Sequence, residues 1–228
     1  AGGYVELRHN VKIPWSASYG KTHQDRTNNL SRVFTKKPLE IETLRFEGGI
    51  SYRPNRFGLL VLGRSTSTSF DDGVSLQDPS VEIIRSDSDF TTNEIEIEGG
   101  YTFRKNHYAF LKTGLGDTKY DRGIYNANTK TFTSRFRDSK NLSILAGLVS
   151  NYKGLVFSEI EAGYQSLNFD DDTIDDVENI VLDAQVDWNI TKLSTLGFRA
   201  NRSVVQDNEI IQGVVNTQGA ISYDYEVL

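Results

Sequence analysis

Residues 93–116, NEIEIEGGYTFRKNHYAFLKTGLG, decide the fold class. In the first half, glutamates at positions 94, 96 and 98 alternate with an apolar series that runs from Ile95 to Phe103. Successive side chains of a β-strand point to opposite faces, so this alternation predicts a strand with one charged face and one apolar face. After RKNH (104–107) the alternation resumes from Ala109 to Leu115. The stretch therefore predicts a two-faced β-hairpin.

The composition extends this interpretation to the whole chain of 228 residues. Glycine (19), tyrosine (11) and phenylalanine (12) are frequent and proline (4) is rare, which favours an all-β fold. The net charge of −6 disfavours a nucleic-acid-binding protein. No apolar run approaches the roughly 18 residues of a transmembrane helix. The absence of cysteine excludes disulfides and thiolate chemistry, and the absence of methionine indicates a chain that is processed or cut from something longer.

Short and long connections alternate along the chain. Tight turns are expected at residues 9–10, 53–56, 104–107, 151–154 and 189–192, and long polar loops at 23–39, 70–91, 119–139, 169–177 and 206–212. Outer-membrane barrels have this pattern, with short periplasmic turns and longer outer loops. We predict a transmembrane antiparallel up-and-down β-barrel, a single domain over residues 1–228, with about eleven strands. The expected strands are residues 2–9, 11–22, 40–53, 57–69, 92–104, 107–118, 140–152, 155–168, 178–189, 193–205 and 213–227.

The expected barrel is incomplete at its C-terminus. Bacterial single-chain barrels have an even number of strands, and the ending SYDYEVL stops where the next tight turn is due. Twelve or more strands are therefore expected in the full protein.

The apolar face is expected to meet lipid. It contains many small residues, which suit a lipid-facing surface better than a tightly packed core. Aromatic residues also lie near the tight turns, as in the belt at a bilayer interface. A soluble barrel with an apolar ligand is the alternative. The predicted aromatic belt consists of Trp15, Tyr52, Phe103, Tyr152, Trp188, Tyr223 and Tyr225.

The charged face is expected to line a watery lumen, because carboxylates turned toward hydrocarbon would be prohibitively costly. Such a face can line a cation-leaning conduit or fill the barrel with salt bridges, and the sequence leaves both open. The predicted lumen-lining residues are Arg45, Glu47, Arg64, Glu94, Glu96, Glu98, Lys112, Glu159, Glu161, Asp183, Asp187 and Arg199.

The segment ETLRFEGGISYRPNRFGLLVLGRSTSTSFDD (42–72) resembles the outer-membrane β-barrel porin family associated with exopolysaccharide export loci. The likeness rests on a Y-R-x-x-R-F turn formed by Tyr52, Arg53, Arg56 and Phe57, and on the ending YDYEVL. The resemblance implies an outer-membrane barrel with more strands than the eleven expected here. It also implies a role in envelope polysaccharide transport or passive diffusion.

Candidate chemistry is sparse. A lipid-modifying enzyme would need a Ser/His pair, for which His23 and the serines of RSTSTSF (64–70) are the available residues. The loop NFDDDTIDD (168–176) offers a weak calcium-site hypothesis, because calcium takes several oxygen ligands at close range. A solvated acidic loop is its alternative. The aspartates concerned are Asp170, Asp171, Asp172, Asp175 and Asp176.

These observations favour a porin-like conduit in a Gram-negative outer membrane over an enzyme, with exopolysaccharide as a candidate cargo. The rivals are a structural or adhesive barrel that binds partners through its long loops and, less favoured, a lipid-modifying enzyme. Expected partners are membrane lipid and lipopolysaccharide, polysaccharide or the export machinery, and no nucleic acid. No cofactor is expected apart from calcium in the outer loops.

Overall fold

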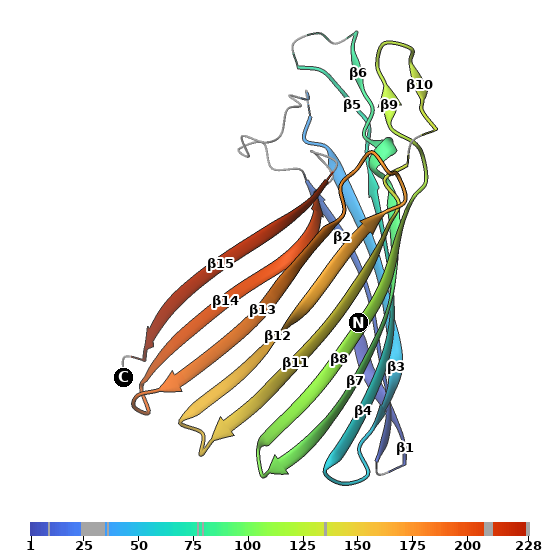
Figure 1. Ribbon diagram of the computed structural model, residues 1–228. Coiled ribbons are helices and arrows are strands. Elements are labelled where there is room, and N and C mark those ends of the chain that lie inside the picture. The colour runs from blue at the N-terminus through green and yellow to red at the C-terminus, as the bar shows by residue number, and fades with distance from the viewer. Residues whose placement is uncertain are drawn as a thin grey trace.

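A computed structural model describes residues 1–8, 10–23, 35, 37–76, 78, 80–134, 136–207 and 212–226. It confirms the all-β prediction, because eleven long strands form one antiparallel sheet in which neighbours in the sequence are neighbours in space (Figure 1). The strands of this sheet are β1 (Gly2–Arg8), β2 (Val11–His23), β3 (Glu40–Tyr52), β4 (Phe57–Phe70), β7 (Phe90–Arg104), β8 (His107–Tyr120), β11 (Ser139–Tyr152), β12 (Val156–Phe169), β13 (Val177–Asn189), β14 (Ser194–Asp207) and β15 (Gln212–Tyr225).

The observed strands begin and end within two residues of the expected ones in nearly every case. Turn chemistry explains this agreement. Asn106 in the RKNH turn has φ 66°, and Lys153 and Gly154 in the NYKG turn have φ 52° and 72°. Two consecutive positive φ values are what a type I′ turn requires, so the turn at Lys153 and Gly154 is of this type and matches the twist of the flanking strands. The turn expected at 9–10 includes His9, which lies outside the described residues.

Two of the long loops contain structure that the sequence did not predict. The β4–β7 loop forms the small hairpin β5 (Gly73–Val74) and β6 (Glu82–Ile83), followed by the 3-10 helix η1 (Ser86–Ser88). The β8–β11 loop forms the hairpin β9 (Tyr125–Asn126) and β10 (Thr131–Phe132). Both hairpins project from the end of the sheet opposite the short turns (Figure 1). The described residues form no helix long and apolar enough to cross a membrane.

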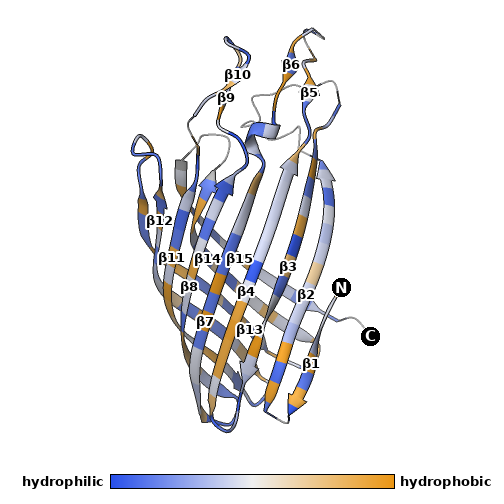
Figure 2. Ribbon diagram, turned by 90° about the vertical axis from the view of Figure 1, so that its right-hand side faces the viewer, coloured by the Kyte–Doolittle hydropathy of each residue, from blue (hydrophilic) through white to orange (hydrophobic). Residues whose placement is uncertain are grey.

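The strand register gives the sheet two chemically different faces. Phe46 on β3 pairs with Ser65 on β4, and Ile97 on β7 pairs with Thr113 on β8, so the apolar series of successive strands lie on one face. We call this the outward face, and the opposite, charged face the inner face. Hydrophobic residues gather in the half of the strands nearer the short turns, whereas the loop ends are mostly neutral or hydrophilic (Figure 2).

The sheet has two edges, β1 and β15, and the described residues of these two strands do not pair with each other. Ten antiparallel pairings separate them, so both run in the same direction, from the loop end to the turn end. An antiparallel closure of this sheet would therefore need an odd number of additional strands between its edges. The expectation of twelve or more strands stays a prediction.

Candidate functional site

The strand register places all twelve predicted lumen-lining residues on the inner face. Each belongs to the parity opposite the apolar series of its strand, as Glu96, paired with Gly114, is opposite to Ile97. Curvature makes this face concave. Gln206 of β14 donates a hydrogen bond to the Tyr120 hydroxyl of β8 (3.1 Å) and accepts one from the Ser139 hydroxyl of β11 (2.9 Å). Strand β14 can reach β8 and β11 only if the sheet curls toward its charged side.

On β3, β4 and β7 the inner face carries a continuous ion-pair chain. Glu47 accepts hydrogen bonds from Arg45 (3.1 Å) and Arg64 (2.9 Å), and Arg64 also donates to Glu94 (2.9 Å). Two arginines therefore neutralise two carboxylates on this side. The side chains are only partly buried, so each pair contributes little to stability, on the order of 1 kcal/mol or less.

Two further ion pairs lie across the sheet. Lys112 on β8 pairs with Glu161 on β12, two strands away, rather than with Glu98, its direct neighbour in the β7–β8 register. The curvature shortens distances across the inner face, which allows this reach over β11. Arg199 on β14 contacts both carboxylate oxygens of Asp187 on β13, at 3.0 and 3.2 Å.

Four of the eight predicted lumen carboxylates have no cationic partner among the described residues. Glu98 accepts a hydrogen bond from the Tyr108 hydroxyl (2.9 Å), and Asp183 accepts one from the Asn201 amide (2.7 Å). Glu96 and Glu159 make no hydrogen bond or ion pair within the described part of the chain. The four basic residues pair with the other four carboxylates, so the twelve residues carry a net charge of −4.

Toward the short turns the inner face is more aromatic than the sequence pattern suggested. The Arg53 guanidinium lies 5.1 Å from the Tyr108 ring centroid, and the Tyr108 and Phe110 rings stack at 5.9 Å. Both rings lie against glycines. A Cβ at Gly100 would approach Tyr108 to 2.3 Å, and one at Gly147 would approach Phe110 to 2.2 Å. The missed signal was the pairing of each aromatic with a glycine one strand away, which only the register reveals.

Toward the loops the inner face is dry rather than hydrated. Leu167 and Phe169 of β12, Val181 of β13 and Val204 of β14 form a buried cluster. The pairing of β14 with β13 stops at Arg202, and the Gln165 side chain then bonds both backbone groups of Val204. The inner face is therefore not watery where this cluster lies, at the loop ends of β12, β13 and β14. Strand β14 leaves its neighbour there and folds over the inner face.

All seven residues of the predicted aromatic belt are exposed on the outward face. The belt marks the turn-side limit of the apolar surface, and its other limit follows from the strands. The apolar series spans eight residue steps on β3 (Leu44 to Tyr52) and on β13 (Ile180 to Trp188). At about 3.3 Å per residue and a tilt of about 40°, eight steps cover about 20 Å of height, close to the apolar band of an outer-membrane barrel.

The β4–β7 and β8–β11 loops dock tightly on each other. The Asp72 carboxylate accepts hydrogen bonds from the backbone N–H groups of Arg85 (2.6 Å) and Ser86 (2.8 Å). Asp87 accepts one from the Tyr125 N–H (3.0 Å) in the other loop, and the buried Arg137 side chain donates to the Asp87 carbonyl. The two loops therefore form an ordered collar at the rim of the sheet.

Asp89, at the base of the collar, accepts a hydrogen bond from the Phe70 N–H (2.7 Å). Burial raises the pKa of the Asp89 carboxyl above its usual range, because desolvation disfavours the charged form. Nearby Asp121 and Asp72 act in the same direction, and Arg122 opposes them.

The acidic loop at 168–176 does not support the calcium hypothesis. Asp171 accepts hydrogen bonds from the N–H (2.9 Å) and the hydroxyl (2.6 Å) of Thr173, and Asp176 accepts one from the Phe169 N–H (2.8 Å). Asp170 pairs with Lys140 on β11 (3.1 Å). No group of three or more histidines or carboxylates converges as a metal site in the described part of the chain. The aspartates, Asp172 and Asp175 included, do not form a common ligand set.

The predicted pairing of His23 with a serine of RSTSTSF (64–70) is not assembled among the described residues either. The His23 Nε2 lies 3.7 Å from a carboxylate oxygen of Glu40. Ser67, on the second strand from His23, accepts a hydrogen bond from the Thr91 hydroxyl instead (3.4 Å). Among the described residues no hydrogen bond joins His23 to a serine.

Comparison with protein-family models matches residues 1–228, the whole chain, to the family described as "Putative beta-barrel porin 2". Neither the curated proteins nor the solved structures contain a match to this chain.

Proposed function

Since the chain belongs to the "Putative beta-barrel porin 2" family, we propose that it is an outer-membrane conduit that favours cations and hydrophilic solutes. Membership in a porin family favours a channel over an enzyme. The carrying observation is the group of four carboxylates on the inner face, Glu96, Glu98, Glu159 and Asp183, that no described cation neutralises. Four carboxylates without a cationic partner on a concave wall raise the local concentration of cations and repel anions.

The two ends of the wall have different roles in this proposal. The middle of the inner face carries the carboxylates and would hold the water and ions. The loop end is narrowed by β14, which Gln206 fastens to β8 and β11. This end would therefore limit solute size, while the carboxylates would set the sign of the preferred ion.

Planar-bilayer recordings test the proposal. In a tenfold KCl gradient the sign of the reversal potential should show that potassium permeates better than chloride. The double variant Glu96→Gln/Glu159→Gln should lower the potassium-over-chloride permeability ratio several-fold, because both side chains lack a partner whose loss would disturb the fold. Glu178→Gln is the matched control, since Glu178 lies on the outward face and should leave selectivity unchanged. A pore without preference between potassium and chloride would contradict the proposed cation preference. So would a permeability ratio that the double variant and the control change equally.

We further propose that the conduit carries polysaccharide, as the resemblance to export-linked porins suggests. Tyr108, Arg53 and Glu98 support this, because an aromatic ring beside a guanidinium and a carboxylate offers stacking and hydrogen-bonding partners for a sugar ring. Tyr108→Ala should slow oligosaccharide entry in liposome swelling assays by a larger factor than it changes KCl conductance. Equal changes in the two fluxes would speak against a sugar contact. Absence of any conductance would favour a structural or adhesive barrel that uses the collar.

A further inference from the structure

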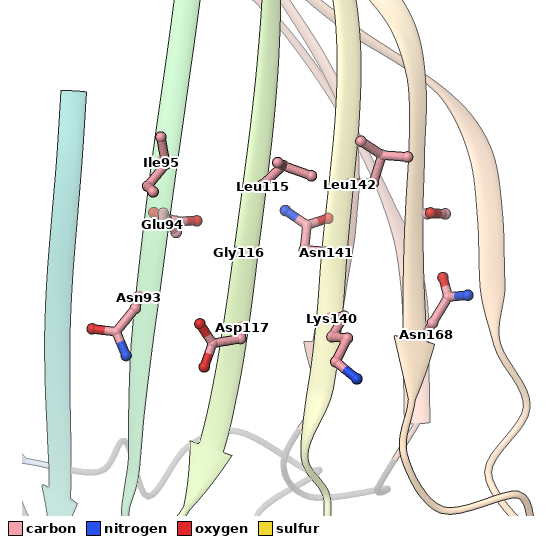
Figure 3. Close-up of a pocket in the computed structure, with 11 residues that line it drawn as sticks. Asn93, Glu94, Ile95, Leu115, Gly116, Asp117, Lys140, Asn141, Leu142 and Asn168 are labelled. Atoms are coloured by element: carbon pink, nitrogen blue, oxygen red, sulfur yellow. The ribbon is translucent and has the colours of Figure 1, made fainter. Parts of the chain in front are cut away.

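We propose that a groove on the outward face of β7, β8, β11 and β12 binds a phosphorylated glycolipid of the outer leaflet. The groove has a volume of about 520 Å³ and lies near the loop ends of these strands (Figure 3). Eight of its eleven lining residues belong to the outward parity, so it opens toward the membrane and not into the lumen. The inference rests on the proposed placement in an outer membrane, with the long loops outside.

Two neighbouring rows of side chains, fixed by the register, build the groove. Nearer the loops, one polar row crosses the four strands, because Asn93 pairs with Asp117, Asp117 with Lys140 and Lys140 with Asn168. The row two residues closer to the turns contains Ile95, Leu115 and Leu142, followed by Ser166. The two rows are about 7 Å apart along the strands. The boundary between headgroups and hydrocarbon therefore crosses the groove.

The polar row is available to a ligand. The side chains of Asn93, Asp117 and Asn168 make no hydrogen bond or ion pair within the described part of the chain. Lys140 contacts Asp170 at 3.1 Å, but both side chains are more than half exposed, so the pair is weak. Lys119, one row further along β8, is also exposed and makes no ion pair among the described residues. The polar row of the groove thus offers one lysine, two amides and a carboxylate, with Lys119 just outside it, while Glu94 in the lining is paired with Arg64.

The chemistry of this row selects the headgroup. Lysine ammonium groups bind phosphate as point charges. Amide side chains donate and accept hydrogen bonds and the carboxylate accepts them, so together they can pair with sugar hydroxyls. A lipid with a phosphate and a sugar ring uses both sets, whereas a simple glycerophospholipid uses only the lysines. The apolar row beneath would contact the acyl chains, with Leu115 exposed between Ile95 and Leu142.

Native mass spectrometry of the detergent-solubilised protein tests this site, with lipid A and, separately, phosphatidylglycerol as probes. We expect one tightly bound lipid A and at least tenfold weaker binding of phosphatidylglycerol. Lys140→Gln should weaken lipid A binding about tenfold, the loss expected for one charge-assisted contact. Lys105→Gln, in a short turn at the opposite end of β7, is the matched control and should change nothing.

A second pair of variants tests the acyl contact. Leu115→Ala should weaken lipid A binding, whereas Leu111→Ala should not, because Leu111 is an exposed outward residue of the same strand that lies outside the groove. Equal affinity for the two lipids, or equal effects of the site and control variants on lipid A binding, would overturn the proposal. Either result would show that the groove makes only the non-specific contacts of annular lipid. Ion conductance in bilayers without lipid A is measured separately. Its loss would refute the conduit, whereas failure of lipid A binding alone would refute only this site.

Discussion

A lysine on the outward face of β7 should destabilise the protein, whereas a lysine on the inner face should have little effect. Ile97 and Glu96 are adjacent in sequence and point to opposite faces of the same strand. Ile97 lies within the apolar series from Ile95 to Phe103, which the proposed orientation places inside the hydrocarbon. A lysine at the bilayer midplane of a β-barrel costs about 2–4 kcal/mol, falling to about 0–1 near the interfaces. Ile97 lies midway between the centre of this series and its loop-side end, so Ile97→Lys should destabilise the protein by about 1–3 kcal/mol.

Glu96→Lys provides the comparison at the same height. Glu96 makes no hydrogen bond or ion pair among the described residues, so its replacement breaks neither, and the new ammonium remains in water beside Glu94 and Glu98. The expected change is within about 0.5 kcal/mol. Denaturant unfolding in lipid vesicles, followed by the fluorescence of Trp15 and Trp188, measures both changes. A cost of 2 kcal/mol or more for Glu96→Lys together with a negligible cost for Ile97→Lys would refute the assignment of the faces.

Three further changes test other parts of the structure. A Cβ at Gly163 would lie 2.0 Å from a backbone oxygen of β11, whereas one at Gly99 would meet nothing within 4 Å. Gly163→Ala should therefore lower the free energy of unfolding, measured with denaturant, by at least about 1–3 kcal/mol. Gly99→Ala should leave it unchanged or raise it slightly. Because the pKa of Asp89 is raised in the folded state, the stability that this group contributes at low pH is lost as the pH rises through the folded-state pKa. Asp89→Asn, which can still accept the hydrogen bond from the Phe70 N–H, should therefore raise the melting temperature at pH 8 and leave it unchanged at pH 3. An equal shift of the melting temperature at both pH values would contradict the buried charge. Gln206→Ala should speed hydrogen exchange in the loop-end half of β14 but not in its turn-end half, and uniform protection would show that this side chain does not fasten the strand.

Most of the sheet could be predicted from the sequence because a half-exposed strand carries a period-two signal. The alternation around Ile95 and Ile97 fixes the faces, and small turn residues such as Asn106 fix the ends of the strands. The same signal placed the charged residues on one face. It could not say which charges would meet, since Lys112 reaches Glu161 over an intervening strand only because the sheet curls.

Other features depend on contacts between distant segments and carry no local pattern. The collar joins Asp87 to Tyr125 across 38 residues, and the departure of β14 from β13 depends on Gln165, 39 residues before Val204. The aspartates at 170–176 were a misleading local signal. Their density predicted a common site, but the loop uses Asp171 and Asp176 separately to satisfy backbone N–H groups.

Site-directed spin labelling along β7 tests the central claim most directly. The chain has no cysteine, so single cysteines at positions 94 to 99 can each carry a nitroxide in the reconstituted protein. Labels at 95, 97 and 99 should be accessible to oxygen dissolved in the lipid, and those at 94, 96 and 98 to a water-soluble nickel complex. The account predicts that the two accessibilities alternate in antiphase with a period of two. An alternation of the opposite sign, or oxygen accessibility at 94, 96 and 98, would contradict it.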